Sequence, residues 1–185
     1  ATISWHLQYA DPLVKVTIVP RGQALGAAWY LPEERQLTSE QHILDKICAL
    51  LGGRAAEEIF FGILDTGALS DLEQATRRAY AMVTYFGMSD KLKNISYYDS
   101  TGQSEFGFSK PYSEATAQLI DREVQRIIDE QYERAKQILL QYKEGHNEVA
   151  QILIDKEVLF AEDLEKVFGK RQWASRAEEI MRNEE

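Results

Sequence analysis

The sequence has one cysteine, four prolines and no long apolar run. The single cysteine, Cys48, excludes an internal disulfide, and its place in an apolar helical stripe predicts a small buried side chain. An apolar fraction of 44% with so little proline excludes a disordered chain. No segment approaches the roughly 20 apolar residues that a membrane-spanning helix needs. We therefore expect these 185 residues to form a soluble, compact, helix-rich protein.

Positive charge is also scarce, because 21 Lys and Arg residues stand against 30 Asp and Glu residues, a net charge of -9. The average surface then repels phosphate, so we expect no nucleic acid among the partners. The sequence also lacks a phosphate-binding glycine loop and a Gly-x-Ser-x-Gly elbow. His6, His42 and His146 stand far apart, and none has a second ligand at the spacing of a zinc-binding helix. Each is interpreted as an ordinary surface or core residue.

What the sequence does contain is a change of hydrophobic period along its length. Residues 1–9 resemble the last turns of a helix, which Asp11 and Pro12 would end. Alternation over residues 14–19 predicts a half-buried strand. The small side chains of residues 25–31 predict a second strand at the edge of a sheet.

From residue 39 onward the period is helical. Gly52 and Gly53 lie within the first helical stretch and predict a close approach of another backbone. Ser70 and Glu73 have the spacing of a capping box at the start of the next helix. The helices predicted after that point cover residues 70–86, 113–142, 147–155 and 161–168. The fold class is therefore mainly α with a small β-sheet (α+β).

Spacing alone says little about chemistry at the acidic positions. Glu57 and Glu58 are adjacent, which is typical of a solvated helix face. Asp71 falls in the first turn of a predicted helix, where a carboxylate stabilises the helix by about 0.3 to 1 kcal/mol. Taken only as patterns, these residues indicate a soluble, mainly helical domain and do not identify an activity.

Several segments in a fixed order nevertheless resemble one protein family. They are DPLVKVTIVPRGQALG at residues 11–26, GGRAAEEIFFG at 52–62 and TGALSDLEQAT at 66–76, with shorter matches at 31–32, 85–88, 112–116 and 120–124. Together they make residues 1–168 resemble the peptidase domain of FtsH-type AAA proteases. The resemblance implies a zincin-like metalloprotease domain followed by a C-terminal helical bundle, and it leaves 169–185 as a charged tail, either a surface helix or a frayed end.

The resemblance carries one metal ligand onto this sequence, Asp71. The family's His-Glu-Ala-Gly-His motif is expected immediately before Ala1, so we expect the sequence to be truncated there and the fragment alone to be inactive. Glu57 is a weaker candidate for holding a ligand histidine through its second ring nitrogen, the alternatives being a salt bridge or a solvated face. The intact site would hold one zinc ion, with a water at the fourth position activated by a neighbouring glutamate.

The predicted edge strand has a physical reason to bind substrate. An unpaired edge offers backbone N–H and C=O groups to any extended peptide, with little regard for its sequence. We therefore expect unfolded polypeptides to bind along one row of residues: Leu25, Gly26, Ala27, Ala28 and Trp29.

For the parent protein the resemblance implies a membrane-anchored, ATP-dependent zinc metalloendopeptidase that degrades unfolded and membrane proteins as a homo-hexamer. ATP and magnesium would belong to an ATPase module outside this sequence, and membrane contact to N-terminal segments outside it. The implied location is the bacterial inner membrane with this domain in the cytoplasm, or else the mitochondrial inner membrane. Two alternatives stay open: a non-catalytic hexamerising scaffold, and a helical module that docks partners through the helix beginning near Ser113.

Overall fold

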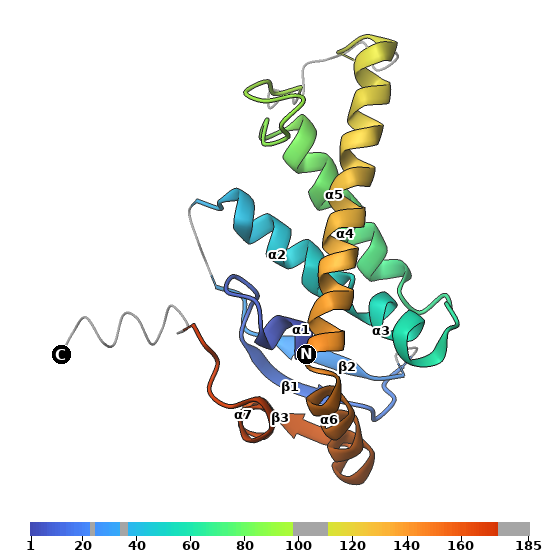
Figure 1. The fold of residues 1–185 in the computed structure, drawn as a ribbon, viewed down its shortest axis with the longest axis vertical. Coiled ribbons are helices and arrows are strands. Elements are labelled where there is room, and N and C mark those ends of the chain that lie inside the picture. The colour runs from blue at the N-terminus through green and yellow to red at the C-terminus, as the bar shows by residue number, and fades with distance from the viewer. Residues whose placement is uncertain (23–24, 34–36, 98–110, 174–185) are drawn as a thin grey trace, which may run out of the picture. The chain divides into compact units, whose positions relative to one another are not determined.

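The computed structural model describes residues 1–22, 25–33, 37–97 and 111–173. It contains helices and one small antiparallel sheet (Figure 1), which confirms the predicted fold class. The chain divides into two compact units. The first comprises Ala1–Thr38 and Ala135–Glu185, and the second comprises Ser39–Arg134.

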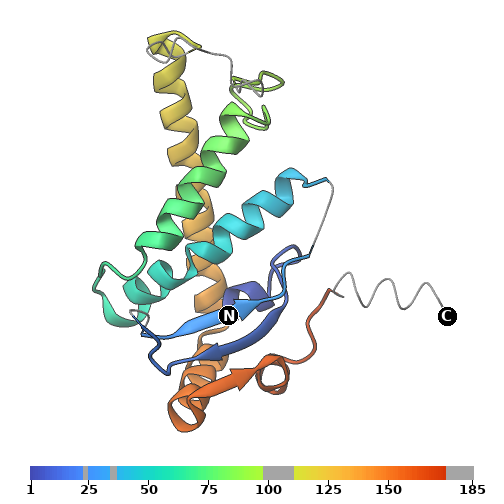
Figure 2. The same cartoon turned by 180° about the vertical axis from the view of Figure 1, so that it is seen from behind.

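The first unit is built on a three-stranded sheet. Strands β1 (Leu13–Thr17), β2 (Ala27–Tyr30) and β3 (Val158–Phe160) pair antiparallel in the order β2-β1-β3. Figures 1 and 2 show β1 between the other two strands from both sides. The third strand was not predicted, because three residues are too few to display an alternating pattern.

A β-bulge between Leu13 and Lys15 changes which side chains of β1 reach the core. An extra residue in one strand shifts the later side chains to the opposite face. Leu13 is therefore buried and Val16 packs with it. Val14 and Ile18 are 45% and 43% exposed, so the prediction that Val14, Val16 and Ile18 share one half-buried face is wrong.

The described residues of the first unit also form α1 (Thr2–Trp5), α6 (Lys143–Lys156), α7 (Ala161–Phe168) and the end of α5 (Glu114–Gln141) from Ala135 onward. The first helix ends four residues before the predicted residue 9, since residues 6–10 turn away from it. The ring of Phe168 packs directly against Gly145 of α6 and occupies the space that a Cβ atom of residue 145 would fill. One buried cluster of the unit contains Leu13, Val149, Leu159 and Leu164.

The second unit is helical. It contains α2 (Glu40–Leu50), α3 (Gly52–Phe61), α4 (Leu69–Thr84) and the part of α5 (Glu114–Gln141) that precedes Ala135. Helices α2 and α4 pack against each other (Figure 2). Their apolar faces and that of α5 form a core that includes Ile47, Leu51, Ala79, Met82, Ile120 and Ile127.

Two predicted details of these helices are wrong. Gly53 lies in the first turn of α3, and a Cβ atom there would meet nothing within 4 Å, so it serves no close backbone approach. The cap of α4 is Ala68, without a side-chain hydrogen bond, whereas Ser70 lies inside the helix and accepts from Gln74. The helix begins early because Asp65 already closes the preceding turn.

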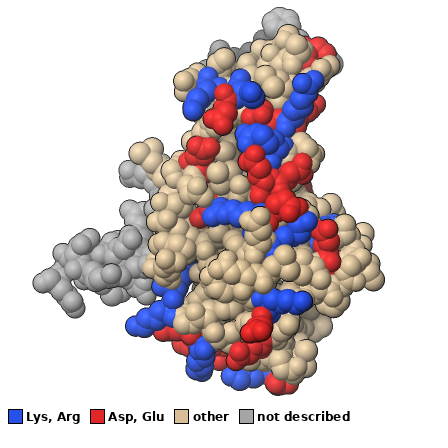
Figure 3. Space-filling view, in the orientation of Figure 1, with Lys and Arg blue, Asp and Glu red and all other residues tan. Residues whose placement is uncertain are grey.

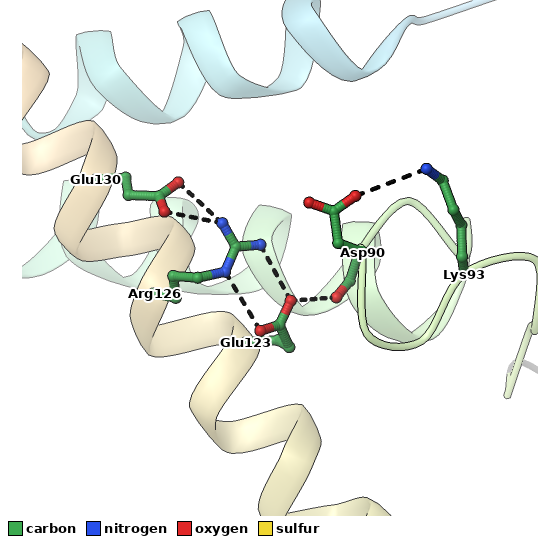
Figure 4. Close-up of polar contacts among 6 residues, drawn as sticks. Asp90, Lys93, Glu123, Arg126 and Glu130 are labelled. Atoms are coloured by element: carbon green, nitrogen blue, oxygen red, sulfur yellow. Dashed lines mark hydrogen bonds and ion pairs between the residues drawn. The ribbon is translucent and has the colours of Figure 1, made fainter.

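A hydrogen-bond network joins the connection after α4 to α5 (Figure 4). The buried Glu123 carboxylate accepts from the Ser89 hydroxyl at 2.5 Å and from Arg126 Nη2 at 3.0 Å. Arg126 also donates to both Glu130 oxygens at 2.9 Å. These bonds, together with the Gly87 turn, hold the connection against the helix.

The charged residues of the described chain are mixed in sign. On the face shown in Figure 3, Lys and Arg side chains are interspersed with Asp and Glu side chains. Among the described residues, no helix combines the length and the apolar character that crossing a bilayer requires.

Candidate metal ligand and peptide-binding edge

Asp71 is the third residue of α4, and a short turn delivers the chain to it. The Asp65 carboxylate accepts a hydrogen bond from the Gly67 N–H at 2.6 Å, which fixes the turn before the helix. Within α4, Asp71 shares a side with Ala75, one turn later, and Ala75 is fully buried. The carboxylate of Asp71 is therefore held half-buried at the margin of the core, on a helix and not on a loop.

Burial raises the pKa of Asp71 above its ordinary value of 3.8. Within the described part of the chain this carboxylate has no hydrogen-bond or ion-pair partner. Partly buried carboxylates are normally paired, because removing an unpaired charge from water is costly. A partly buried carboxylate without a protein partner is a suitable ligand for a cation such as zinc.

Asp71 does not form a metal site by itself. No group of three or more His, Cys, Asp or Glu side chains suited to a metal occurs among the described residues. The three histidines have other contacts: His6 stacks on Tyr142 at 3.5 Å between ring centroids, His42 bonds to the Ser39 hydroxyl, and His146 bonds to Thr2. A catalytic zinc needs three protein ligands, and Asp71 as one of them stays a prediction.

Glu57 lies on α3 and forms an ion pair with Arg54 at 3.6 Å. Its side chain is only 23% exposed, and its Oε2 atom is buried without a hydrogen bond. This geometry does not match a solvated face. It leaves an acceptor available, so the role of Glu57 behind a ligand histidine stays a prediction.

Glu58, the neighbour of Glu57, is also engaged. It accepts a hydrogen bond from the Tyr132 hydroxyl of α5. Burial and this bond raise the pKa of Tyr132. Glu58 is exposed, as the prediction of a solvated face has it, but its hydrogen bond to Tyr132 was not predicted, because amphipathic spacing does not reveal a long-range partner.

The predicted edge strand is present but shorter than predicted. β2 begins at Ala27, so Leu25 and Gly26 precede it, whereas Ala27, Ala28 and Trp29 lie in it. Gly26 passes so close to β1 that a Cβ atom would lie 2.7 Å from the Thr17 carbonyl oxygen. This close approach needs glycine at residue 26. The small side chain there serves the approach to β1, although the sequence pattern suggested that it belonged to the strand.

Within the described residues β2 pairs only with β1, so its other side is an edge of the sheet. The Leu31 N–H donates to the Pro12 carbonyl at 2.8 Å and therefore faces the β1 side. Successive N–H groups of a strand point to opposite sides, so the N–H groups of Trp29 and Ala27 also face β1. The N–H group of Ala28 then faces the edge.

Trp29 presents its ring above the sheet. The Lys15 ammonium lies 4.7 Å from the centroid of this ring, and the two residues are register partners. Such a cation–π contact holds the indole on the face of the sheet.

One well-contacted polar residue was missed by sequence reasoning. Arg171, which lies in the predicted charged tail, donates to three backbone carbonyl groups of the first unit. No motif or period in the sequence marks it.

Comparison with known proteins gives consistent results. The model of peptidase family M41 matches residues 1–167. The chain is 64% identical over all 185 residues to an ATP-dependent zinc metalloprotease FtsH of Parabacteroides distasonis, covering 27% of that protein. It is 52% identical over 167 residues (90% of this chain, 27% of the relative) to the FtsH of Karelsulcia muelleri. It is 45% identical over 177 residues (96% of this chain, 22% of the relative) to the mitochondrial inner membrane m-AAA protease component AFG3L1 of Mus musculus. The chain thus spans about a quarter of the length of these curated relatives.

Proposed function

This chain belongs to peptidase family M41, and we propose on that basis that it is part of a membrane-anchored, ATP-dependent zinc metalloendopeptidase that degrades unfolded and membrane proteins. The observation that carries the proposal is the half-buried, unpartnered carboxylate of Asp71 at the start of α4. The carboxylate has no protein partner among the described residues, so it can bind a cation such as zinc without breaking another contact.

Each candidate residue has a defined task in this proposal. Asp71 supplies one anionic oxygen to the zinc, and its helical position restricts where that oxygen lies. The two histidine ligands and the general-base glutamate are those that the resemblance implies before Ala1. A zinc ion held there would supply a nucleophile at neutral pH, because it would lower the pKa of a water molecule towards 7. The Oε2 of Glu57, which is ion-paired with Arg54 but has no hydrogen bond, accepts a ring N–H of a ligand histidine, which fixes the ring's orientation.

The edge of β2 is proposed to hold the substrate. The Ala28 N–H donates to a carbonyl group of an extended peptide, which then adds to the sheet as a further strand. Backbone recognition of this kind is tolerant of side chains, because every residue except proline offers the same groups. It suits an enzyme whose substrates are unfolded chains of varied sequence.

For the whole protein we propose the assembly that the relatives' names support in outline. "ATP-dependent" in the name of the Parabacteroides relative supports an ATPase module with ATP and magnesium, outside the present residues. A homo-hexamer with one zinc per subunit is proposed, anchored in a bacterial inner membrane with this domain in the cytoplasm. The higher identity to the bacterial relatives than to the mouse mitochondrial protein favours the bacterial location.

The test compares Asp71→Ala with Glu73→Ala in the full-length protein. Glu73 lies one half-turn further along α4, where it is exposed and paired with Arg77. We expect Asp71→Ala to lose bound zinc and casein cleavage while keeping ATP hydrolysis and thermal stability, and Glu73→Ala to keep all four. Wild-type zinc content and cleavage in Asp71→Ala would exclude the ligand assignment. A wild-type protein with neither zinc nor cleavage would instead favour the non-catalytic scaffold.

A further inference from the structure

Three side chains form a row across the sheet of the first unit. Lys15 of β1 is the register partner of Trp29 on β2 and of Phe160 on β3. Their neighbours Val16 and Leu159 pack into the buried cluster to which α6 and α7 contribute. Because side chains alternate between the two faces of a sheet, the row lies on the opposite face, where Trp29 is 37% and Phe160 is 49% exposed. Trp29 stands at the end of this row, on the strand that forms an edge of the sheet (Figures 1 and 2).

Trp29 is the large side chain that β2 offers to a neighbouring strand. Ala27 and Ala28 carry only methyl groups, and Tyr30 packs against the buried cluster. The Lys15 ammonium lies 4.7 Å from the centroid of the Trp29 ring, and Lys15 comes from β1, on the paired side of β2. A side chain that arrives along the free edge therefore approaches the indole from the other side.

A strand added to the edge of β2 would bring one of its side chains against this ring. Residues directly opposite each other in paired strands point to the same face of the sheet, with Cβ atoms about 5 Å apart. The substrate residue opposite Trp29 then lies beside the indole, whereas the residue opposite Ala28 meets only a methyl group on the other face. Hydrogen bonds to a strand edge give affinity for any extended chain, and side-chain contacts of this kind give selectivity.

We propose that Trp29 is a specificity-determining residue, which favours an aromatic or large aliphatic substrate residue beside it and disfavours lysine or arginine there. This inference rests on the proposed function, which adds an unfolded substrate to the edge of β2. It concerns a choice among segments of the substrate that backbone recognition alone does not make.

The surroundings of the indole account for this preference. An apolar substrate side chain covers exposed indole surface, and an aromatic one adds a favourable pairing of the rings. A cationic side chain is also attracted to the ring, but the Lys15 ammonium already occupies one cation position there. The charge of Lys15 repels a second positive charge at close range, so a cationic side chain gains less than an apolar one.

The experiment uses the full-length protein with Trp29→Thr and the matched control Phe160→Thr. Threonine keeps the preference for a strand at both positions. Phe160 is an exposed aromatic residue of the same row, but β1 and β2 separate it from the free edge, so it lies roughly 14 Å from an added strand. The substrates are threonine- and serine-rich peptides with Phe or Lys at one position, which is moved along the peptide residue by residue. The measured quantity is the ratio of kcat/KM for the Phe peptide to kcat/KM for the Lys peptide at each position.

We expect the wild-type ratio to reach about three- to tenfold at one position of the peptide, which is the size of effect that an aromatic pair contributes. Trp29→Thr should lower this largest ratio to below about twofold, because the ring that carries the preference is gone. Phe160→Thr should keep the wild-type ratio. Lys15→Gln removes the ammonium and should lower the ratio about twofold or more by improving the Lys peptide alone.

A wild-type ratio near one at every position, or an unchanged ratio in Trp29→Thr, would overturn the proposal. An equal loss in Phe160→Thr would do the same, because that residue cannot contact the added strand. Should Trp29→Thr fail to fold, an unchanged ratio in Lys15→Gln refutes the selection by Trp29.

Ala28→Pro separates this result from the role of the edge itself. If Ala28→Pro raises the KM of all peptides alike while Trp29→Thr changes no ratio, the edge binds substrate and only the selection by Trp29 fails. A wild-type protein that cleaves no peptide would overturn the proposed function, and this inference with it.

Discussion

The Ser89 hydroxyl donates a 2.5 Å hydrogen bond to the buried carboxylate of Glu123, thirty-four residues away in the sequence. Arg126 donates to the same carboxylate, and Lys91 lies near enough to favour its charged form. The Arg126 hydrogen bonds above all, aided by Ser89, hold the pKa of Glu123 below its ordinary value of 4.5 against the opposing effect of burial. The connection after α4 is thus attached to α5 through the charged carboxylate of Glu123.

The Glu123→Gln variant should lose this contribution in a pH-dependent way. A group whose pKa is lower in the folded state stabilises the fold above its unfolded pKa and loses that effect as the pH falls through the folded pKa. At pH 7 we expect Glu123→Gln to lower the free energy of unfolding by about 1 to 3 kcal/mol. The deficit should shrink below about pH 4.5. Urea denaturation at pH 7 and pH 4 measures both values.

The control for this experiment is Glu130→Gln. Glu130 binds the same arginine but its side chain is 55% exposed, so we expect a loss below about 1 kcal/mol at either pH. Equal losses for the two variants at pH 7 would show that burial of Glu123 contributes nothing.

Gly87 should tolerate alanine less well than Gly62. Both have positive φ, +57° and +65°, so each substitution strains the backbone by about 1 to 2 kcal/mol. At Gly87 a Cβ atom would also lie 2.9 Å from backbone N and O atoms of Ile95, whereas at Gly62 it would meet nothing. We expect Gly87→Ala to lower the melting temperature clearly more than Gly62→Ala. Equal shifts in a thermal scan would mean that the loop at Ile95 moves freely.

Proline scanning of β2 should separate substrate binding from stability. Ala28→Pro removes an N–H group that faces the edge, whereas Ala27→Pro removes one that faces β1. We expect Ala28→Pro to raise the KM for an unfolded substrate several-fold with zinc content and melting temperature nearly unchanged. Ala27→Pro should lower the melting temperature. An unchanged KM for Ala28→Pro would remove the peptide-binding role of the edge.

Asp45 should be one of the most sensitive charged positions of the second unit. It is 1% exposed and accepts from Arg134 at 2.7 Å and from Gln41 at 2.8 Å. Asp45→Ala removes a buried acceptor from Gln41 and from Arg134, whose side chain is 36% exposed, so we expect a loss of about 1 to 3 kcal/mol in the free energy of unfolding. The exposed Glu73 provides the comparison, since Glu73→Ala should cost less than about 1 kcal/mol. Similar denaturation midpoints for the two variants would contradict this ranking.

Local sequence patterns predicted the longer elements of this fold well. The helix predicted over 113–142 is α5, and the one predicted over 161–168 is α7, because long or well-bounded apolar periods report helix directly. The predicted family was confirmed by the match to peptidase family M41. That prediction used exact motifs in order, which carry more information than periodicity does.

Features that depend on distant partners could not be predicted. β3 exists because β1 is available to pair with it, and the bulge at Leu13 follows from the same pairing geometry. Asp71 could be proposed as a ligand from its motif, but its lack of a partner is visible only in the fold. Arg171 has no local signal, since its acceptors lie more than 160 residues earlier.

The pairing of Thr17 with Val158 can form only late in the synthesis of the chain. The ribosome releases β1 early, but the strand that covers one of its sides emerges about 140 residues later, after the whole of Ser39–Arg134. During that interval we expect the second unit to fold while the side of β1 that later pairs with β3 stays unpaired. Strands of neighbouring nascent chains can pair with such an exposed edge. Slow translation or a stop before Val158 would therefore favour aggregation over a merely shortened protein.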